Sequence, residues 1–188
     1  MPLLLASGSP RRREFLELSG IPFQVVKPDV PEVRRRGEAP VAFARRLARE
    51  KAGAVLRLHP GATVLAADTI VVLGERVLGK PRDAAEAARM LRALSGRTHA
   101  VITAFAVLSG ERSLVRAVRT RVVFRKVRRG EIDAYVATGC PLDKAGAYAI
   151  QGGAAGMVQS ISGSYTNVVG LPLAEVLEAL RAFNVVPE

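Results

Sequence analysis

The sequence predicts an α/β fold, with a mixed central sheet flanked by helices and a single domain over residues 1–188. Short apolar runs typical of strands alternate with helical segments at both ends of the chain, and two long strand-like runs lie between them. A length of 188 residues, 49% of them hydrophobic, is sufficient for one domain with a substantial core.

In the first half of the chain, helix starts and turn residues separate five elements. Ser9 and Pro10 have the residue types of a helix cap and a first helical position, and Gly20 ends that helix. Pro40 opens a second, longer helix. We expect strands at residues 3–6, 23–26 and 63–73, and helices at residues 9–19 and 40–58.

In the second half, Asp83 and Glu86 have the spacing of a capping box, and Gly96 ends the helix that they open. Two long strands should follow, joined by a turn at residues 109–111. We expect helices at residues 83–94 and 129–137, strands at residues 98–108, 113–124 and 157–161, and a C-terminal helix that starts at Pro172.

The net charge of +11 favours an anionic partner such as a nucleotide, a nucleic acid or an acidic surface. Nucleic-acid binding gains no further support, because only 5% of the residues are aromatic and no known binding motif is present. Cys140 is the only cysteine, which indicates a reducing compartment. The apolar start precedes its arginines, unlike a signal peptide, and no run approaches the roughly 20 apolar residues of a membrane span. We therefore expect a cytoplasmic protein with no membrane partner.

The segment from Ser7 to Arg12 reads Ser-Gly-Ser-Pro-Arg-Arg between a strand and a helix. Free N–H groups at such a helix start form an anion site. The hydroxyls of Ser7 and Ser9 can donate hydrogen bonds, and Arg11 and Arg12 can bind phosphate oxygens in a forked geometry. The motif is neither a Walker loop nor a G-x-G-x-x-G motif. An ordinary capped helix with a solvated basic turn would explain it equally well.

Asp68 lies in the strongly apolar run at residues 64–72. A buried carboxylate there needs a charged partner, which would be a metal ion, a lysine or an arginine, unless Asp68 caps a turn at a strand end. Lys80 stands between Gly79 and Pro81, in a turn that would fix the direction of its side chain. An exposed lysine in a surface loop is an equally good interpretation. Glu32 lies in a loop, and its position alone indicates only a solvent-exposed glutamate.

The stretch at residues 142–152 combines a charge pair, Asp143 and Lys144, with small residues and Gln151 between glycines. Small residues permit close approach of the backbone to a ligand. The alternative for the charge pair is a local salt bridge of little energetic value. Residues 163–172 form a second glycine-bounded loop, which we interpret as a capped helix start. His59 and His99 lack ligand-like spacing and should be structural or at the surface.

Taken together and in order, these motifs resemble the Maf family of nucleoside triphosphate pyrophosphatases over nearly the whole chain. Two positions depart from the family pattern: Ala149, where glycine is common, and Cys140, where an acidic residue is frequent. Neither position is catalytic in that pattern. The matching segments are residues 7–12, Glu32, and residues 48–52, 67–69, 79–81, 142–148, 150–152 and 167–173.

The resemblance implies an extended α/β fold with two lobes and a cleft between them, usually as a homodimer. It implies hydrolysis of a nucleoside triphosphate to the monophosphate and pyrophosphate with a divalent cation, Mg²⁺ or Mn²⁺. Asp68 would be the proton acceptor, Glu32 and Lys80 would be further catalytic residues, and Glu32 and Asp68 would hold the metal. The substrate-binding residues would be Ser7, Ser9, Arg11, Arg12, Lys51, Thr69, Asp143, Lys144 and Gln151.

Three of these residues, Arg11, Thr69 and Gln151, match the residues that mark the family's dTTP/UTP subgroup. The amide of Gln151 offers a donor beside an acceptor, which matches the edge of uracil or thymine but not that of cytosine. We therefore expect hydrolysis of dTTP and UTP, with modified pyrimidine nucleotides as further candidates, in a role that limits incorporation of unwanted nucleotides. The alternatives are a 7-methyl-GTP pyrophosphatase of the same family, a division-regulating protein, and a nucleic-acid-binding protein or nucleotide sensor without catalysis.

Overall fold

The computed structural model describes residues 2–110 and 112–185, and the chain divides into two compact units. The first unit comprises Met1–Asp68, Thr103–Val118 and Gly170–Glu188, and the second comprises Thr69–Ile102 and Arg119–Val169. Glu111, in the expected turn, lies outside the described residues. The single domain and the two-lobed cleft stay predictions.

Seven strands of the described residues form one sheet in the order β2-β1-β3-β5-β6-β7, with β4 beside β3. β1 runs parallel to β2 and β3, whereas β4 and β7 run antiparallel to β3 and β6. The predicted α/β class with a mixed sheet is confirmed. The strands are β1 (Leu3–Ala6), β2 (Phe23–Val25), β3 (Thr63–Leu73), β4 (Arg76–Leu78), β5 (Thr98–Ser109), β6 (Arg112–Phe124) and β7 (Val158–Ser162).

The helices flank this sheet, and none in the described part of the chain is long and apolar enough to cross a membrane. They are α1 (Pro10–Leu18), α2 (Pro40–Leu58), α3 (Ala84–Leu94), α4 (Arg129–Ala137), α5 (Tyr165–Val169) and α6 (Leu173–Ala182), with short 3₁₀ helices η1 (Ala145–Ala147) and η2 (Ala155–Met157). β4, α5 and both 3₁₀ helices were not predicted. α5 has only five residues, three of them β-branched, and depends on the Ser164 hydroxyl, which accepts a hydrogen bond from the Asn167 N–H at 3.1 Å.

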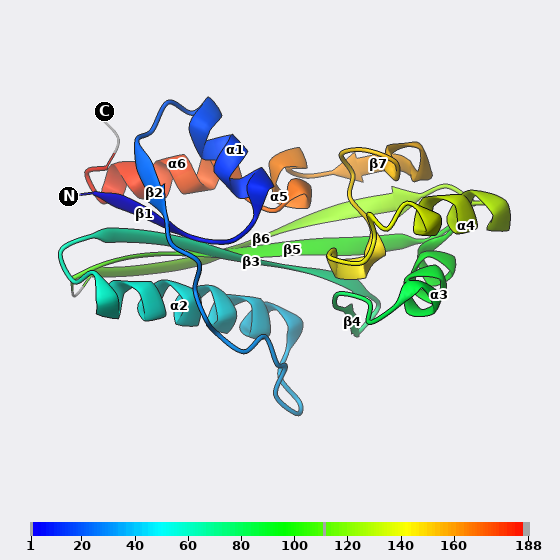
Figure 1. The fold of residues 1–188 in the computed structure, drawn as a ribbon, viewed down its shortest axis with the longest axis horizontal. Coiled ribbons are helices and arrows are strands. Elements are labelled where there is room, and N and C mark those ends of the chain that lie inside the picture. The colour runs from blue at the N-terminus through cyan, green and yellow to red at the C-terminus, as the bar shows by residue number, and fades with distance from the viewer. Residues whose placement is uncertain (1, 111, 186–188) are drawn as a thin grey trace. The chain divides into compact units, whose positions relative to one another are not determined.

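Helices cover both faces of the sheet in the first unit. Figure 1 shows α2 on one face and α1 and α6 on the other. All four residues of β1 are buried, which explains why this strand reads as a continuous apolar run instead of an alternating one. The side chains at the centre of this unit include Leu5, Leu16, Leu47, Leu65, Phe105 and Leu180.

The second unit has its own core, to which the strands contribute alternate residues. Val71 of β3, Val101 of β5 and Val122 of β6 belong to this core, and α3 and α4 supply Leu91, Leu94 and Ile132. Because successive side chains of a strand point to opposite faces, the residues next to these strand positions lie on the other face of the sheet.

One edge of β3 is paired with two different strands, and a gap lies between them. The register with β1 ends at the Ala6–Ala66 pair, and the register with β4 begins at the Val71–Leu78 pair. Residues 67–70 therefore lie outside both ladders, so backbone groups on that edge need other partners. Asp68 and Thr69 belong to this stretch.

Candidate functional site

A lysine and two carboxylates meet in the first unit. Lys51 of α2 and Asp68 of β3 are both buried, and the Lys51 Nζ lies 2.7 Å from the Asp68 Oδ1. The same nitrogen lies 2.6 Å from Oε1 of Glu32. Of the partners that the sequence left open for Asp68, the structure provides a lysine. The turn-capping alternative is wrong, because Asp68 lies inside a strand of eleven residues.

Arg12 connects the start of α1 to the gap in the β3 edge. Its Nη1 donates to the Ala67 carbonyl at 2.8 Å and to the Ser7 hydroxyl at 3.3 Å, and its Nε donates to the Gly170 carbonyl at 2.8 Å. Burial lowers the pKa of Arg12, while Asp68 and Glu32 act in the opposite direction. The guanidinium stays charged because arginine starts from so high a pKa. Arg12 is therefore a cation fixed beside both carboxylates.

Replacing Arg12 by Lys should destabilise the protein although the charge is kept. A lysine ammonium cannot reproduce the planar fork that reaches two carbonyls and a hydroxyl, so at least one buried acceptor would lose its partner. An unsatisfied buried group costs about 1–3 kcal/mol, and we expect a loss of that order in urea unfolding. The exposed substitution Arg13→Lys, one residue along α1, is the matched control, and equal stabilities of the two variants would contradict this interpretation of Arg12.

The other residues of the predicted phosphate-binding start adopt a different pattern from the expected helix cap. Ser9 is the residue that caps α1, but its side chain makes no capping hydrogen bond. The Ser7 hydroxyl instead accepts the Ser9 N–H at 3.1 Å. No acidic residue lies in the first turn, where Arg11 follows Pro10, so the positive end of the helix dipole has no carboxylate from this turn. This start keeps the features of an anion site, and the phosphate-binding roles of Ser7, Ser9, Arg11 and Arg12 stay predictions.

Two cations and two carboxylates make this cluster close to neutral. Arg12 and Lys51 balance Glu32 and Asp68, so the four side chains together carry little charge with which to attract a triphosphate. Additional positive charge would have to come from other side chains or from a metal ion.

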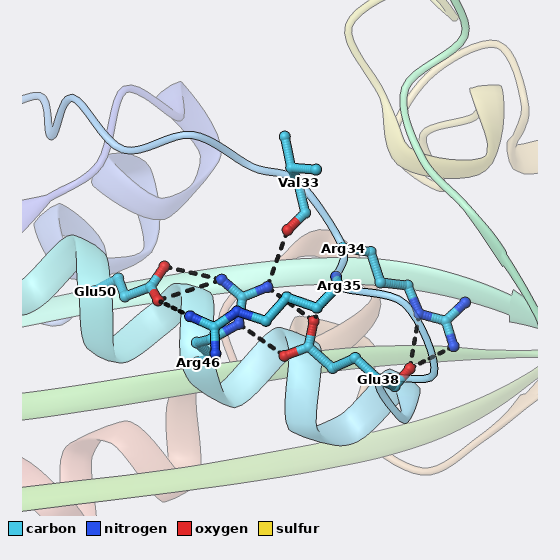
Figure 2. A network of polar contacts seen from close by, with 6 residues as sticks. All are labelled: Val33, Arg34, Arg35, Glu38, Arg46 and Glu50. Atoms are coloured by element: carbon cyan, nitrogen blue, oxygen red, sulfur yellow. Dashed lines mark hydrogen bonds and ion pairs between the residues drawn. The ribbon is translucent and has the colours of Figure 1, made fainter.

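A second network holds the loop that carries Glu32 against α2 (Figure 2). Arg46 of α2 donates its Nε and Nη2 to the two carboxylate oxygens of Glu38, at 2.7 and 2.8 Å, and Nη2 also donates to the Val33 carbonyl at 3.0 Å. Glu50 accepts from the Nη1 of the same arginine at 3.0 Å. A bidentate pair of this kind fixes orientation as well as distance. Arg46 therefore holds the Glu32 loop beside the helix that carries Lys51.

Glu38 should make folding stability depend on pH in the acid range. The hydrogen bond from Arg46 is the main reason why the pKa of Glu38 falls from 4.5 to about 2. Because the pKa is lower in the folded state, the stabilisation is complete above pH 4.5 and disappears as the pH falls towards 2. In urea unfolding, the difference in free energy of unfolding between wild type and Glu38→Gln should be larger at pH 7 than at pH 3.

Glu131 provides the matched comparison, because Arg125 lowers its pKa to about 2 in the second unit. Glu131→Gln should show the same dependence on pH without loosening the Glu32 loop. A difference between wild type and Glu38→Gln that stays constant across this range would contradict the prediction.

The remaining candidates, Thr69, Lys80, Asp143, Lys144 and Gln151, belong to the second unit. There the Gly146 N–H donates to the Gly79 carbonyl at 3.0 Å, which places the segment before Lys80 beside η1. Asp143 and Lys144 form an ion pair with each other, as the local-salt-bridge alternative expected. The single cleft that would join these residues to the cluster around Lys51 stays a prediction.

The segment that carries Gln151 is anchored by two tyrosines, Tyr148 and Tyr135, for which the sequence predicts no role. The Tyr148 hydroxyl lies 2.7 Å from Nε2 of His99, and the Tyr135 hydroxyl accepts the Ala149 N–H at 3.2 Å. Burial lowers the pKa of His99 to about 4 and raises that of Tyr148, so both side chains are neutral near pH 7. The structural role expected for His99 is confirmed. Gln151 is half-buried and follows directly after these anchors.

Comparison with known proteins identifies the family. A family model described as Maf-like protein matches residues 2–183. The chain belongs to the Maf family. Three Maf relatives are named dTTP/UTP pyrophosphatase. The relative from Geobacter sulfurreducens is 59% identical over 181 residues, which cover 95% of this chain and 95% of its own. The relative from Citrifermentans bemidjiense is 56% identical over 184 residues (97% and 95%), and the one from Myxococcus xanthus is 55% identical over 179 residues (95% and 91%).

The metal implied by the Maf resemblance can be tested against the donor atoms. Among the described residues no group of three or more His, Cys, Asp or Glu side chains could hold a metal ion. Glu32 and Asp68 nevertheless place two carboxylate oxygens beside one nitrogen. Two hard donors of this kind fit Mg²⁺, which is commonly held by one or two carboxylates, waters and substrate phosphates, and do not fit a closed structural zinc site.

Proposed function

We propose that this Maf protein hydrolyses dTTP and UTP to the nucleoside monophosphate and pyrophosphate, which limits the incorporation of unwanted nucleotides. The observation that carries the proposal is that relatives 55–59% identical over at least 95% of this chain bear the name dTTP/UTP pyrophosphatase. The cluster around Lys51 supplies the physical basis, because it combines cations with a proton acceptor.

In the proposed reaction, a water oxygen bonds to the α-phosphorus and the bond from that phosphorus to the α–β bridging oxygen breaks. Pyrophosphate leaves with the bonding electrons, and Asp68 accepts the proton of the water. Lys51 keeps the carboxylate of Asp68 in place through the 2.7 Å contact. Ser7, Ser9, Arg11 and the start of α1 would bind the phosphates, because this chemistry needs mainly positioning and charge stabilisation.

A divalent cation completes the proposal, with Glu32 and Asp68 as its protein ligands. When bound, Mg²⁺ or Mn²⁺ would neutralise phosphate charge and lower the pKa of a coordinated water. The near-neutral cluster is the reason to expect such a requirement. Loss of turnover in EDTA and its recovery with added Mg²⁺ or Mn²⁺ would support it, and full activity in EDTA would exclude it.

For base selection we propose the amide of Gln151, with Thr69 and Lys80 as further substrate-binding or catalytic groups in the second unit. The His99–Tyr148 and Tyr135–Ala149 hydrogen bonds limit the freedom of the segment before Gln151. A restrained amide distinguishes bases better than a mobile one, because a mismatched base leaves buried polar groups without partners.

The decisive assay is pyrophosphate release from dTTP, UTP, CTP and 7-methyl-GTP, each with and without metal. We expect kcat/KM to be highest for dTTP and UTP. Faster hydrolysis of CTP or 7-methyl-GTP would overturn the substrate assignment. Binding of all four without pyrophosphate release would favour a nucleotide sensor.

We further propose that the protein acts in the cytoplasm as a homodimer and does not use nucleic acid as a partner. Light scattering coupled to size-exclusion chromatography tests the dimer, and a monomer at micromolar concentration would contradict it. Salt-dependent DNA binding in the absence of triphosphate hydrolysis would favour the nucleic-acid-binding alternative.

A further inference from the structure

In the second unit, the sheet face opposite the α3–α4 core carries two arginines. On β6, Thr120 and Val122 are buried, and the alternating positions Arg119 and Arg121 are exposed. On β7, Ser162 pairs in register with Arg121, so both side chains lie on the same face of the sheet. Cationic and hydroxyl groups therefore lie together on this face.

These residues line a cavity of about 400 Å³. Two buried apolar residues, Val72 of β3 and Ala100 of β5, lie among its lining. The polar residues of the lining are Arg119, Arg121, Thr98, His99 and Ser162, and Gly74 contributes at the turn after β3. All of them belong to the second unit. A volume of this size lies within the range of small-molecule pockets.

Neither arginine has an ion-pair partner among the described residues. Other arginines of the chain do: Arg116 pairs with Glu178, and Arg125 pairs with Glu131. Arg119 and Arg121 are two residues apart on one strand face, so their Cα atoms are separated by roughly 7 Å. Like charges on neighbouring positions of one strand face repel each other, and an anion bound by both arginines would relieve the repulsion.

We propose that this cavity binds a small phosphorylated molecule with an uncharged ring, such as a sugar phosphate. The guanidinium forks of Arg119 and Arg121 match phosphate oxygens, and the hydroxyls of Thr98 and Ser162 can donate further hydrogen bonds. The apolar surface of Val72 and Ala100 suits the uncharged part. None of these residues belongs to the predicted catalytic set, so the proposal does not depend on the hydrolysis of dTTP and UTP.

The test is an NMR titration of the full chain with ribose 5-phosphate at physiological salt, following the amides of Thr98, Arg119, Arg121 and Ser162. We expect saturable shifts at these amides and at least a tenfold weaker affinity in the double variant Arg119→Gln/Arg121→Gln. The control is Arg89→Gln/Arg92→Gln, which removes the same charge from exposed positions of α3 and should bind like wild type. Arg121→Lys keeps the charge but loses the guanidinium fork, and should bind with intermediate affinity. This variant provides the test if the double variant fails to fold.

Three results would overturn the proposal. The first is the lack of saturation at these amides in the wild-type protein. The second is equal weakening in the α3 control, which would indicate diffuse charge attraction. The third is a DNA oligonucleotide that shifts the same amides at lower concentration than ribose 5-phosphate, which would make this face a nucleic-acid surface.

Discussion

Replacing Asp68 by Asn should lower kcat for dTTP hydrolysis by about 10²–10⁴-fold, the usual contribution of a general base. The amide has the shape of the carboxylate but cannot accept the proton of the attacking water. It also removes one of the two carboxylates on the Lys51 ammonium and leaves the contact with Glu32. Steady-state kinetics with saturating metal measures the effect.

Asp133→Asn is the matched control, since that carboxylate lies on the exposed surface of α4 and pairs only weakly with Arg129, at 3.6 Å. It should keep wild-type kcat. Urea unfolding of both variants separates a catalytic loss from a folding defect. Near-normal turnover of a folded Asp68→Asn protein would refute the role of Asp68 as proton acceptor.

Replacing Gly146 by Ala should strongly destabilise the second unit. Its φ is +69°, and an added Cβ would lie 2.8–2.9 Å from three side-chain atoms of Val71. The left-handed conformation costs roughly 1–2 kcal/mol for a residue with a Cβ, and overpacking adds about 1–3 kcal/mol. We expect a loss of about 2–5 kcal/mol in urea unfolding.

Gly139→Ala separates the two contributions, because Gly139 has a φ of +74° and an added Cβ would meet nothing within 4 Å. This control should show the backbone cost alone. The double variant Gly146→Ala/Val71→Ala should lose less than the sum of its single changes, since the smaller side chain relieves the clash. Equal losses in Gly146→Ala and Gly139→Ala would show that Val71 moves aside without cost.

The elements that the sequence predicted well are those whose ends are marked by local chemistry. α2 begins at Pro40, β1 is a continuous apolar run, and β3 is a run of mainly apolar residues around Asp68. The structure places all three where they were expected. The capping box at α3 is only half formed. Asp83 accepts the Glu86 N–H at 2.7 Å, but the Glu86 carboxylate accepts from the Arg82 N–H instead of returning to Asp83.

The candidate site could be predicted only in part from the sequence. An acidic residue inside an apolar strand requires a charged partner, and this argument correctly anticipated a contact such as that of Asp68 with Lys51. The pairing of Arg46 with Glu38 could not be anticipated, because a loop and a helix bring these residues together and no local period links them. The same holds for Tyr148 and His99, which are 49 positions apart.

The gap along β3 becomes a hazard if the segments that cover it are lost. Ala67, Asp68 and Ile70 are buried in the folded protein, but an uncovered strand edge is a template on which a second polypeptide can add, and such addition can begin aggregation. Arg12 blocks part of this edge by binding the Ala67 carbonyl. A protein that has lost the start of α1 should therefore precipitate as well as lose activity.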